Sequence, residues 1–217
     1  MSEPRQAPRS VTPKEPTPWY GLPFVGVGHL FWIWVMLIIV EWSSPWWGHS
    51  MVGNHAKQVF LDSLATFNTE QPDMAGKLMQ LLKNSMTTLA PMLTLHFSGF
   101  LAFFEPYWHG VVYVTLSLFA RVALLFYSWP LFLLASFLGM FDGLIMRQRR
   151  TAFVGRETET THFYSRKALP WVVMGTGYVW LLVPGIWSVS PVWLLLPGVF
   201  LTGMLVRTAF ASYKKYL

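Results

Sequence analysis

The 217-residue sequence contains no cysteine, so disulfides, thiolate metal sites and cysteine nucleophiles are excluded together. Charged residues are also scarce, at 12% of the chain, whereas 53% of the chain is hydrophobic and 17% is aromatic. A water-soluble surface needs more charge than this, and membrane interfaces favour amphipathic aromatic side chains. The composition therefore predicts an integral membrane protein, and it leaves the redox compartment undetermined.

Sequence motifs of enzymes and metal sites are missing as well. The chain has no HExxH, P-loop, GxSxG or GxGxxG motif, and no carboxylate pair placed inside an apolar run as in proton carriers. His49 and His55 lack the one-turn spacing that puts two metal ligands on one helix face. The sequence thus predicts no catalytic residue, no metal ligand and no cofactor, and it favours a function other than catalysis.

The N-terminal part of the chain changes character near Leu22. Residues 1–18 hold five of the 15 prolines and cannot bury enough apolar surface to fold, so we expect a disordered cytoplasmic tail. Residues 19–217 are expected to form a single membrane domain. Its first apolar run, residues 22–42, has about the 20 residues that a helix needs to cross ~30 Å of hydrocarbon, and it is expected to remain as a membrane anchor.

Three further apolar runs of this length follow, at residues 122–141, 169–187 and 192–210. The predicted fold class is therefore all-α, with about four transmembrane helices. Several glycines in these runs allow helices to approach one another closely, namely Gly139, Gly143, Gly175 and Gly177.

Residues 43–108 separate the first two spans and are mixed in character. Their apolar residues recur at three- and four-residue spacing, which predicts amphipathic helices outside the bilayer core. Residues 89–104 are more apolar, but Pro91 interrupts them and they are shorter than a full span. We expect this stretch to be re-entrant, interfacial or packed against other helices, with a fifth crossing as the alternative.

The positions of Lys and Arg predict how the spans are oriented. These residues cluster in the tail, in residues 142–168 and at the C-terminal end, whereas those of residues 43–108 are offset by acids. Short cytoplasmic loops retain positive residues, and four spans place every basic cluster on one side. We therefore expect both ends and a basic loop, residues 142–168, in the cytoplasm, and a periplasmic segment at residues 43–108.

Arg121 precedes an uncharged run that already spans the hydrocarbon core. This places it at the outer boundary, from which its side chain can reach headgroups. The alternative is a buried arginine paired with Glu105 or Glu41, which would mark a functional site because charge at mid-depth is costly. A small membrane enzyme or transporter would then use an intramembrane polar site made of His29, His96, Glu105 and Arg121. The two histidines are equally explained by hydrogen bonds between packed helices.

Residues 142–168 carry the most concentrated positive charge, and three explanations are open. Arginines that bind anionic lipid headgroups account for the charge, each contributing about 1 kcal/mol near the surface. A polar surface that docks a partner protein accounts in addition for the acidic residues and the glycine. Direct nucleic-acid binding is a third and weaker explanation, because aromatic residues such as Phe153 and Tyr164 accompany the arginines over only a short patch.

The same segment resembles a known family. The string Asp142-Gly143-Leu144-Ile145 is followed by spaced arginines, a Gly-Arg-Glu sequence and a His-to-Lys ending. This pattern, between a long second span and a final helical pair, resembles uncharacterised membrane proteins of bacterial integrating conjugative elements. The resemblance implies an inner-membrane protein that works in conjugative DNA transfer, beside a type IV secretion apparatus or its coupling ATPase.

The sequence thus leads to one hypothesis with two alternatives. The chain is expected to be an inner-membrane accessory protein of conjugative transfer that contacts membrane lipids and docks a secretion-channel or coupling protein. The predicted partner-binding residues are Arg147, Arg150, Gly155, Arg156, Glu157, His162 and Lys167. The alternatives are the small membrane enzyme or transporter described above and a lipid-binding structural scaffold.

Overall fold

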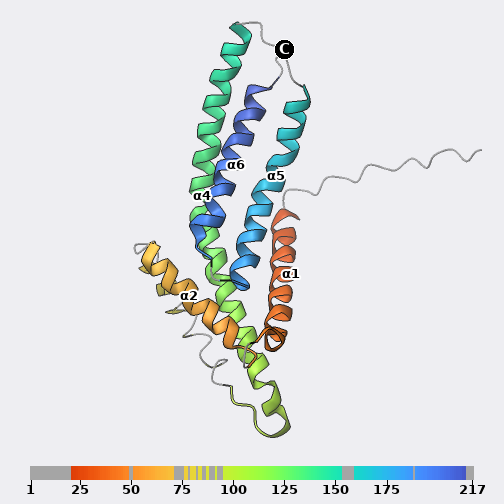
Figure 1. Ribbon diagram of the computed structural model, residues 1–217, viewed down its shortest axis with the longest axis vertical. Coiled ribbons are helices and arrows are strands. Elements are labelled where there is room, and N and C mark those ends of the chain that lie inside the picture. Colours follow the sequence, from red (N-terminus) through yellow and green to blue (C-terminus); the bar gives the residue numbers. More distant parts are fainter. Residues whose placement is uncertain are drawn as a thin grey trace, which may run out of the picture. The chain divides into compact units, whose positions relative to one another are not determined.

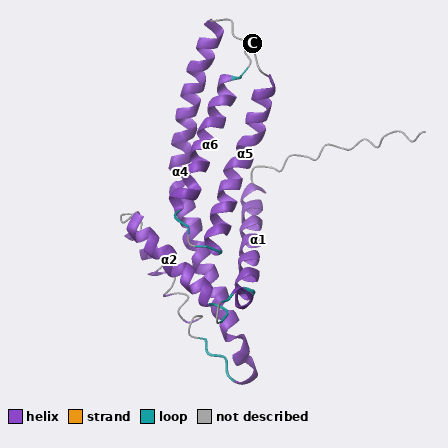
Figure 2. Cartoon of the chain, in the orientation of Figure 1, coloured by secondary structure: helices purple, strands orange, loops and turns teal. Residues whose placement is uncertain are grey.

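The computed structural model of the chain describes residues 21–48, 51–70, 76–77, 79–81, 83–84, 87, 91, 95–152, 159–187 and 189–213. Helices dominate this part of the chain, which contains no strand (Figure 2). The predicted all-α class is therefore confirmed. The chain divides within its first helix into two units, Met1–Trp32 and Ile33–Leu217, and the packing described below is that of the second unit.

Five long helices, labelled in Figure 1, and three short 3-10 turns have bounds within the described residues. The long helices are α1 (Leu22–Trp42), α2 (Asn54–Glu70), α4 (Glu105–Ala152), α5 (Glu159–Leu182) and α6 (Pro191–Ala211). The turns are η2 (Ser44–Trp47), η3 (Gly99–Phe104) and η4 (Val183–Gly185). Four of the helices, α1, α4, α5 and α6, are long and apolar enough to cross a membrane, as the sequence predicts.

Helix α4 is far longer than the span predicted within it. It contains 48 residues and has Pro130 in its interior. At 1.5 Å per residue it is about 72 Å long, more than twice the thickness of a hydrocarbon core. Whatever its tilt, α4 extends beyond the predicted span, residues 122–141, at both ends.

The predicted basic loop, residues 142–168, is mostly helical, and the sequence interpretation is wrong on this point. Helix α4 continues to Ala152 and helix α5 already begins at Glu159. The residues at the end of α4 are leucine, methionine, glutamine and arginine, all good helix formers, and charge does not oppose a helix in water. The basic side chains of this segment that the structure describes therefore stand on helices.

The segment between the first two spans contains the predicted amphipathic helix. Helix α2 buries Val59 and Phe60, with the Phe60 ring 6.4 Å from that of Tyr113, and it exposes Leu61. The described part of residues 89–104 consists of irregular chain at 95–98 and the η3 turn. No helix of crossing length is present in those described residues, so they give no support to a fifth crossing.

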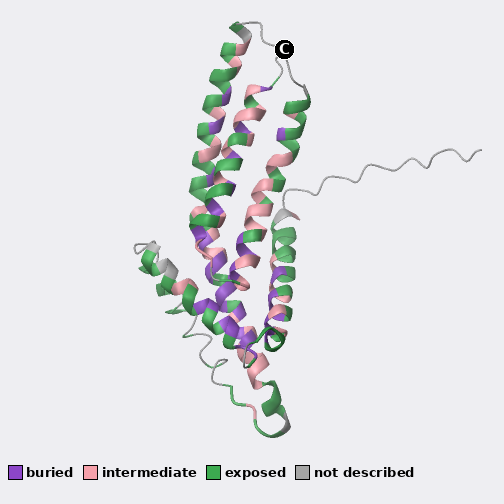
Figure 3. Ribbon diagram, in the orientation of Figure 1, coloured by how far each residue is buried: buried purple, intermediate pink, exposed green. Residues whose placement is uncertain are grey.

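Helix α4 contacts all the other long helices and the η3 and η4 turns. Near its start, Thr115 accepts a hydrogen bond of 2.9 Å from Trp34 Nε1 of α1. Further along, α5 and α6 pack beside α4, as Figure 1 shows. Buried side chains are concentrated where α2, α4 and η4 meet (Figure 3), and they include Leu116, Ala120 and Trp180.

Candidate functional site

The basic residues gather where the C-terminal ends of α4 and α6 meet the N-terminal end of α5 (Figure 1). We call this region the basic end and define its centre by Arg147, Arg150, His162 and Tyr213. The Arg147 guanidinium carbon lies 5.4 Å from the centroid of the Tyr213 ring, which is within the range of a cation–π interaction. The His162 ring packs edge-on against the same tyrosine, with 5.5 Å between centroids. Tyr213 therefore contacts Arg147 and His162, two of the predicted docking residues.

Backbone contacts fix the basic end further. His162 Nδ1 donates a hydrogen bond of 3.0 Å to the carbonyl oxygen of Ala209, which ties α5 to α6. Arg150 Nη2 lies 3.5 Å from the carbonyl oxygen of Tyr213 and donates to it weakly. A groove of about 410 Å³ lies between the C-terminal ends of α4 and α6 and the start of α5. It is lined in part by Arg149, Arg150 and Met146. The groove is open to solvent and carries guanidinium groups at its edge.

Glycines bring α4 and α6 close enough for this arrangement. A Cβ atom at Gly139 would collide with the carbonyl oxygen of Gly203, and one at Gly143 would lie 2.6 Å from the carbonyl oxygen of Arg207. The predicted close approach at these two glycines is therefore present. Near the same crossing, Arg207 Nε and Asp142 Oδ2 form an ion pair of 2.5 Å on the surface. At Gly175, by contrast, an added Cβ atom would meet no other atom within 4 Å, so no close helix approach depends on this glycine.

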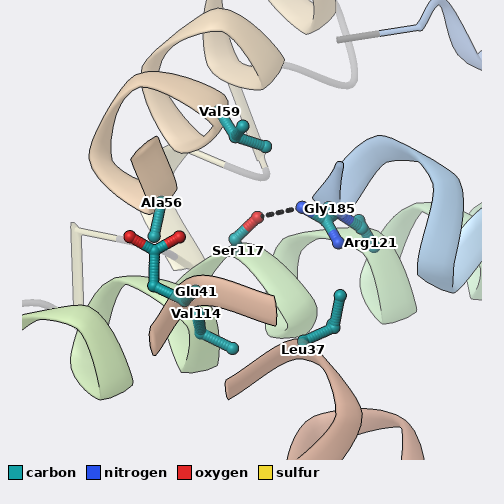
Figure 4. A pocket seen from close by; sticks show the side chains of 8 residues that line it. All are labelled: Leu37, Glu41, Ala56, Val59, Val114, Ser117, Arg121 and Gly185. Carbon is teal, nitrogen blue, oxygen red and sulfur yellow. Dashed lines mark hydrogen bonds between the residues drawn. The ribbon is translucent and has the colours of Figure 1, made fainter. Parts of the chain in front are cut away.

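A second cluster of polar residues lies buried at the other end of the packed helices. Arg121 of α4 is only 2% exposed. Its Nη2 donates 2.6 Å to Ser117 Oγ, shown by the dashed line in Figure 4, and 3.0 Å to the carbonyl oxygen of Pro184. Its Nη1 donates 3.1 Å to the carbonyl oxygen of Leu181. The guanidinium thus satisfies carbonyls that the end of α5 and the η4 turn leave without helical partners.

The Arg121 side chain turns into the protein and does not reach outward toward headgroups, so the burial that the alternative expects is present. Its depth in the membrane and its part in a functional site stay predictions. The structure gives Arg121 no ion pair with Glu41 or Glu105, and backbone carbonyl oxygens accept its hydrogen bonds instead. A cavity of about 10 Å³ beside Arg121, also lined by Glu41, has the volume of one water molecule.

Glu41, at the end of α1, connects to the start of α2. Its Oε1 accepts a 2.8 Å bond from the amide of Gly53, and its Oε2 lies 2.9 Å from Nδ1 of His55. The other ring nitrogen of His55 lies 3.3 Å from the carbonyl oxygen of Ile186. The hydrogen bond to Glu41 raises the pKa of His55 above its ordinary value of 6.5, against the opposing effects of burial and Arg121.

Comparison with known proteins identifies the family. Residues 60–214, more than two thirds of the chain, match the model of a family described as IncC plasmid conjugative DNA transfer protein DtrJ-like. The chain belongs to the DtrJ-like family. No curated protein and no solved structure matches it. The expected context of conjugative DNA transfer is thereby confirmed, whereas the predicted origin in an integrating conjugative element stays a prediction.

The residues matched by the family model include the whole basic end of this DtrJ-like protein but only part of the buried polar cluster. The whole basic end, from Arg147 to Tyr213, lies inside the matched residues, and so does Arg121. Glu41 and His55 precede the match. Of the predicted docking residues, the structure brings Arg147, Arg150 and His162 together. The remaining ones lie apart or outside the description: Lys167 is beside Phe163, at 5.8 Å from its ring, and Gly155, Arg156 and Glu157 lie outside the described residues.

Of the residues predicted to form one intramembrane polar site in the DtrJ-like chain, the structure brings two together and separates Arg121 from them. His96 Nδ1 lies 3.1 Å from Glu105 Oε1, so these two meet. Arg121 is 16 residues farther along α4 than Glu105, about 24 Å by helical rise, and belongs to the buried cluster. His29 lies on α1 in the first unit. Within the described residues, no group of three His, Asp or Glu side chains has a geometry that would hold a metal ion.

Sequence reasoning missed Tyr213, His109 and the role of His55. Tyr213 lies between the last predicted span and Lys214, where tyrosines of membrane interfaces are common. This position was the signal in the sequence that could have identified it. His109 follows Glu105 by one helical turn and lies 3.7 Å from its Oε1. For His55 no local signal existed, because its partners come from α1 and from the turn after α5.

Proposed function

We propose that this DtrJ-like protein is a multi-pass inner-membrane protein of conjugative DNA transfer that docks a secretion-channel or coupling protein through its basic end. The observation that carries the proposal is the gathering of Arg147, Arg150 and His162 around Tyr213. A surface that only attracts anionic lipid requires charge but no fixed geometry. Here the side chains are held on three helix ends, as a specific interface requires.

The exposed side chains of the helices that are long and apolar enough to cross a membrane support a membrane location. Helices α4 and α6 direct large apolar groups outward over most of their length, among them Leu138, Trp193 and Phe200 (Figure 3). Contiguous apolar surface of this extent is costly in water and is ordinary in lipid. The bilayer is the environment in which this surface is stable.

Aromatic and basic residues at opposite ends of the helices support the proposed orientation. Exposed tryptophans follow α1 and α5, at Trp46 and Trp187, as in the aromatic belts of membrane interfaces. Basic side chains, by contrast, surround the ends of α4 and α6 at Arg149 and Arg207. Positive residues are retained in the cytoplasm, so we place the basic end and both termini inside and α2 outside.

The test is photo-crosslinking in the native donor cell. A photo-reactive residue replaces Phe163, which is exposed on α5 beside Lys167. A matched control carries the same residue at Trp46, which is exposed on η2 beyond the other end of the helices. We expect the Phe163 probe, and not the Trp46 probe, to capture a secretion-channel or coupling protein.

Other outcomes of this experiment decide against the proposal. Capture of phospholipid alone at position 163 would support the lipid-binding scaffold. Capture of the transferred DNA strand would support direct nucleic-acid binding. Equal capture of one protein from both positions would show that contact does not depend on the basic end.

A further inference from the structure

The docking proposal makes no use of the buried pair formed by Glu41 and His55. Glu41 is 2% exposed and His55 is 7% exposed, although both are ionisable. Ionisable side chains are almost never fully buried unless they are paired, and when they are paired their charge states depend on each other. The pair joins α1 to α2, and His55 continues the connection to the end of the α5–α6 turn.

The geometry around His55 selects one protonation state. Nδ1 faces a carboxylate oxygen of Glu41 at 2.9 Å, and Nε2 faces the carbonyl oxygen of Ile186 at 3.3 Å. Both of these oxygens are acceptors. A neutral imidazole has one N–H and one lone pair, so it can donate to only one of them, whereas the imidazolium donates to both.

The charged groups that face His55 come from two elements. Glu41 of α1 favours the imidazolium, and Arg121 of α4 opposes it. The turn after α5 contributes the Ile186 carbonyl, which favours the imidazolium. On the side of Glu41, the amide of Gly53, just before α2, donates to the second carboxylate oxygen, so that this carboxylate is held by Gly53 and by His55 of α2.

We infer that Glu41 and His55 form a proton-binding site that fastens α2 to α1 and to the α5–α6 turn. With the proton bound, His55 makes both of its hydrogen bonds and α2 is held at its N-terminal end. When the proton leaves, one ring nitrogen presents a lone pair to an acceptor, and one attachment of α2 is lost. The inference stands apart from the docking proposal, since the two sites share no residue.

The direction of the pH dependence follows from the raised pKa of His55. A group whose pKa is higher in the folded state than its ordinary value of 6.5 stabilises the folded state fully below that value. The contribution is lost as pH rises through the raised value. Helix α2 should therefore be held most tightly in mildly acidic solution and should open more often above neutral pH.

Single cysteines can report on this opening because the chain contains no other cysteine. Val59 of α2 is buried at 6% exposure, and Leu61 of the same helix is 51% exposed. In full-length protein in membrane vesicles, the maleimide labelling rate of Val59→Cys is divided by that of Leu61→Cys at each pH. The ratio corrects for the general increase in thiol reactivity with pH.

We expect this ratio to rise about tenfold between pH 6 and pH 8.5, because the proton that holds α2 is lost as pH rises through the raised pKa of His55. In the His55→Gln background the ratio should not change with pH. A ratio that is constant in the chain with His55 overturns the inference, and so does an equal rise in the His55→Gln background. Should His55→Gln fail to accumulate, Glu41→Gln provides the second background, in which the rise must move to lower pH because the carboxylate that favours the imidazolium is gone.

Discussion

At the scale of single residues, Arg121 shows how a cation is accommodated in an apolar helix bundle. Its guanidinium donates hydrogen bonds to the Ser117 hydroxyl and to carbonyl oxygens at the end of α5 and in the η4 turn. None of these acceptors is a carboxylate. In return, Trp180 Nε1 donates 3.0 Å to the carbonyl oxygen of Arg121. The residue thus joins α4 to the α5–α6 turn from both its side chain and its backbone.

Replacing Arg121 should therefore destabilise the protein strongly. Arg121→Ala removes three hydrogen bonds from a charged donor and leaves buried carbonyls unpaired, which should lower the free energy of unfolding by about 3 kcal/mol. The matched control is Arg166→Ala on the exposed surface of α5, which should change it by less than about 0.5 kcal/mol. Unfolding in detergent measures both. Equal effects of the two variants would contradict the buried role.

The basic end yields a prediction about function. Reversing the charge of Arg147 and Arg150 together to glutamate should reduce transfer frequency between cells at least tenfold, which is about 1.4 kcal/mol of docking free energy. Lys57→Glu, on α2, is the control and should leave transfer unchanged. Immunoblotting of membranes checks that both variants accumulate. Undiminished transfer by the double variant would remove the basic end from the mechanism.

At the scale of secondary-structure elements, the crossing of α4 and α6 depends on two small residues. Gly139→Ala places a methyl group against the backbone carbonyl of Gly203, which cannot move away as a side chain could. Gly175→Ala adds the same methyl in open space and should be neutral or stabilising by up to about 1 kcal/mol, since alanine favours a helix.

We expect Gly139→Ala to lower stability by about 1–3 kcal/mol, the usual effect of overpacking. It should also weaken the basic end, because Tyr213 follows α6 and would move with it. The thermal midpoint in detergent measures the first effect, and crosslinking yield from position 163 measures the second. A result in which Gly175→Ala does more harm than Gly139→Ala is incompatible with the crossing described.

The helices themselves were largely predictable, and the reason is physical. A run of about 20 apolar residues is a property of the sequence alone, so the regions that became α1 and α6 could be located closely, whereas α5 begins at Glu159, before its predicted span of residues 169–187. The continuation of α4 through Arg147 and Arg150 was missed because basic charge was taken to indicate a loop. Charge determines which side of a membrane a segment occupies, but the propensity of the residues determines whether it is helical.

The candidate sites were predictable only in part. Arg147, Arg150 and His162 belong to one stretch of sequence and were identified from their local pattern. Arg121 also bonds the carbonyl oxygen of Leu181, 60 positions away, and His55 lies beside that of Ile186, 131 positions away, and no periodicity indicates such pairings. Burial of a polar residue is a property of the tertiary packing, and a single sequence does not contain it explicitly.

At the scale of the whole molecule, the proposed orientation makes a direct prediction. Asn68→Cys, exposed on α2, should react with a membrane-impermeant maleimide in intact spheroplasts. Arg166→Cys, exposed on α5, should react only after the membrane is permeabilised. The reason is that positive residues are kept on the cytoplasmic side and α2 is at the opposite end of the packed helices. The reverse pattern would invert the topology and place the basic end outside the cell.

The length of α4 has a mechanical consequence. From Arg121, where it is fastened to the α5–α6 turn, α4 runs without interruption to Ala152, a distance of about 46 Å by helical rise. A continuous helix of this length would act as a lever. If it pivots at Arg121 by about 10°, its far end moves by about 8 Å, roughly the separation of two packed helices. In the proposed orientation, a small adjustment at the Arg121 end would then become a larger displacement at the basic end.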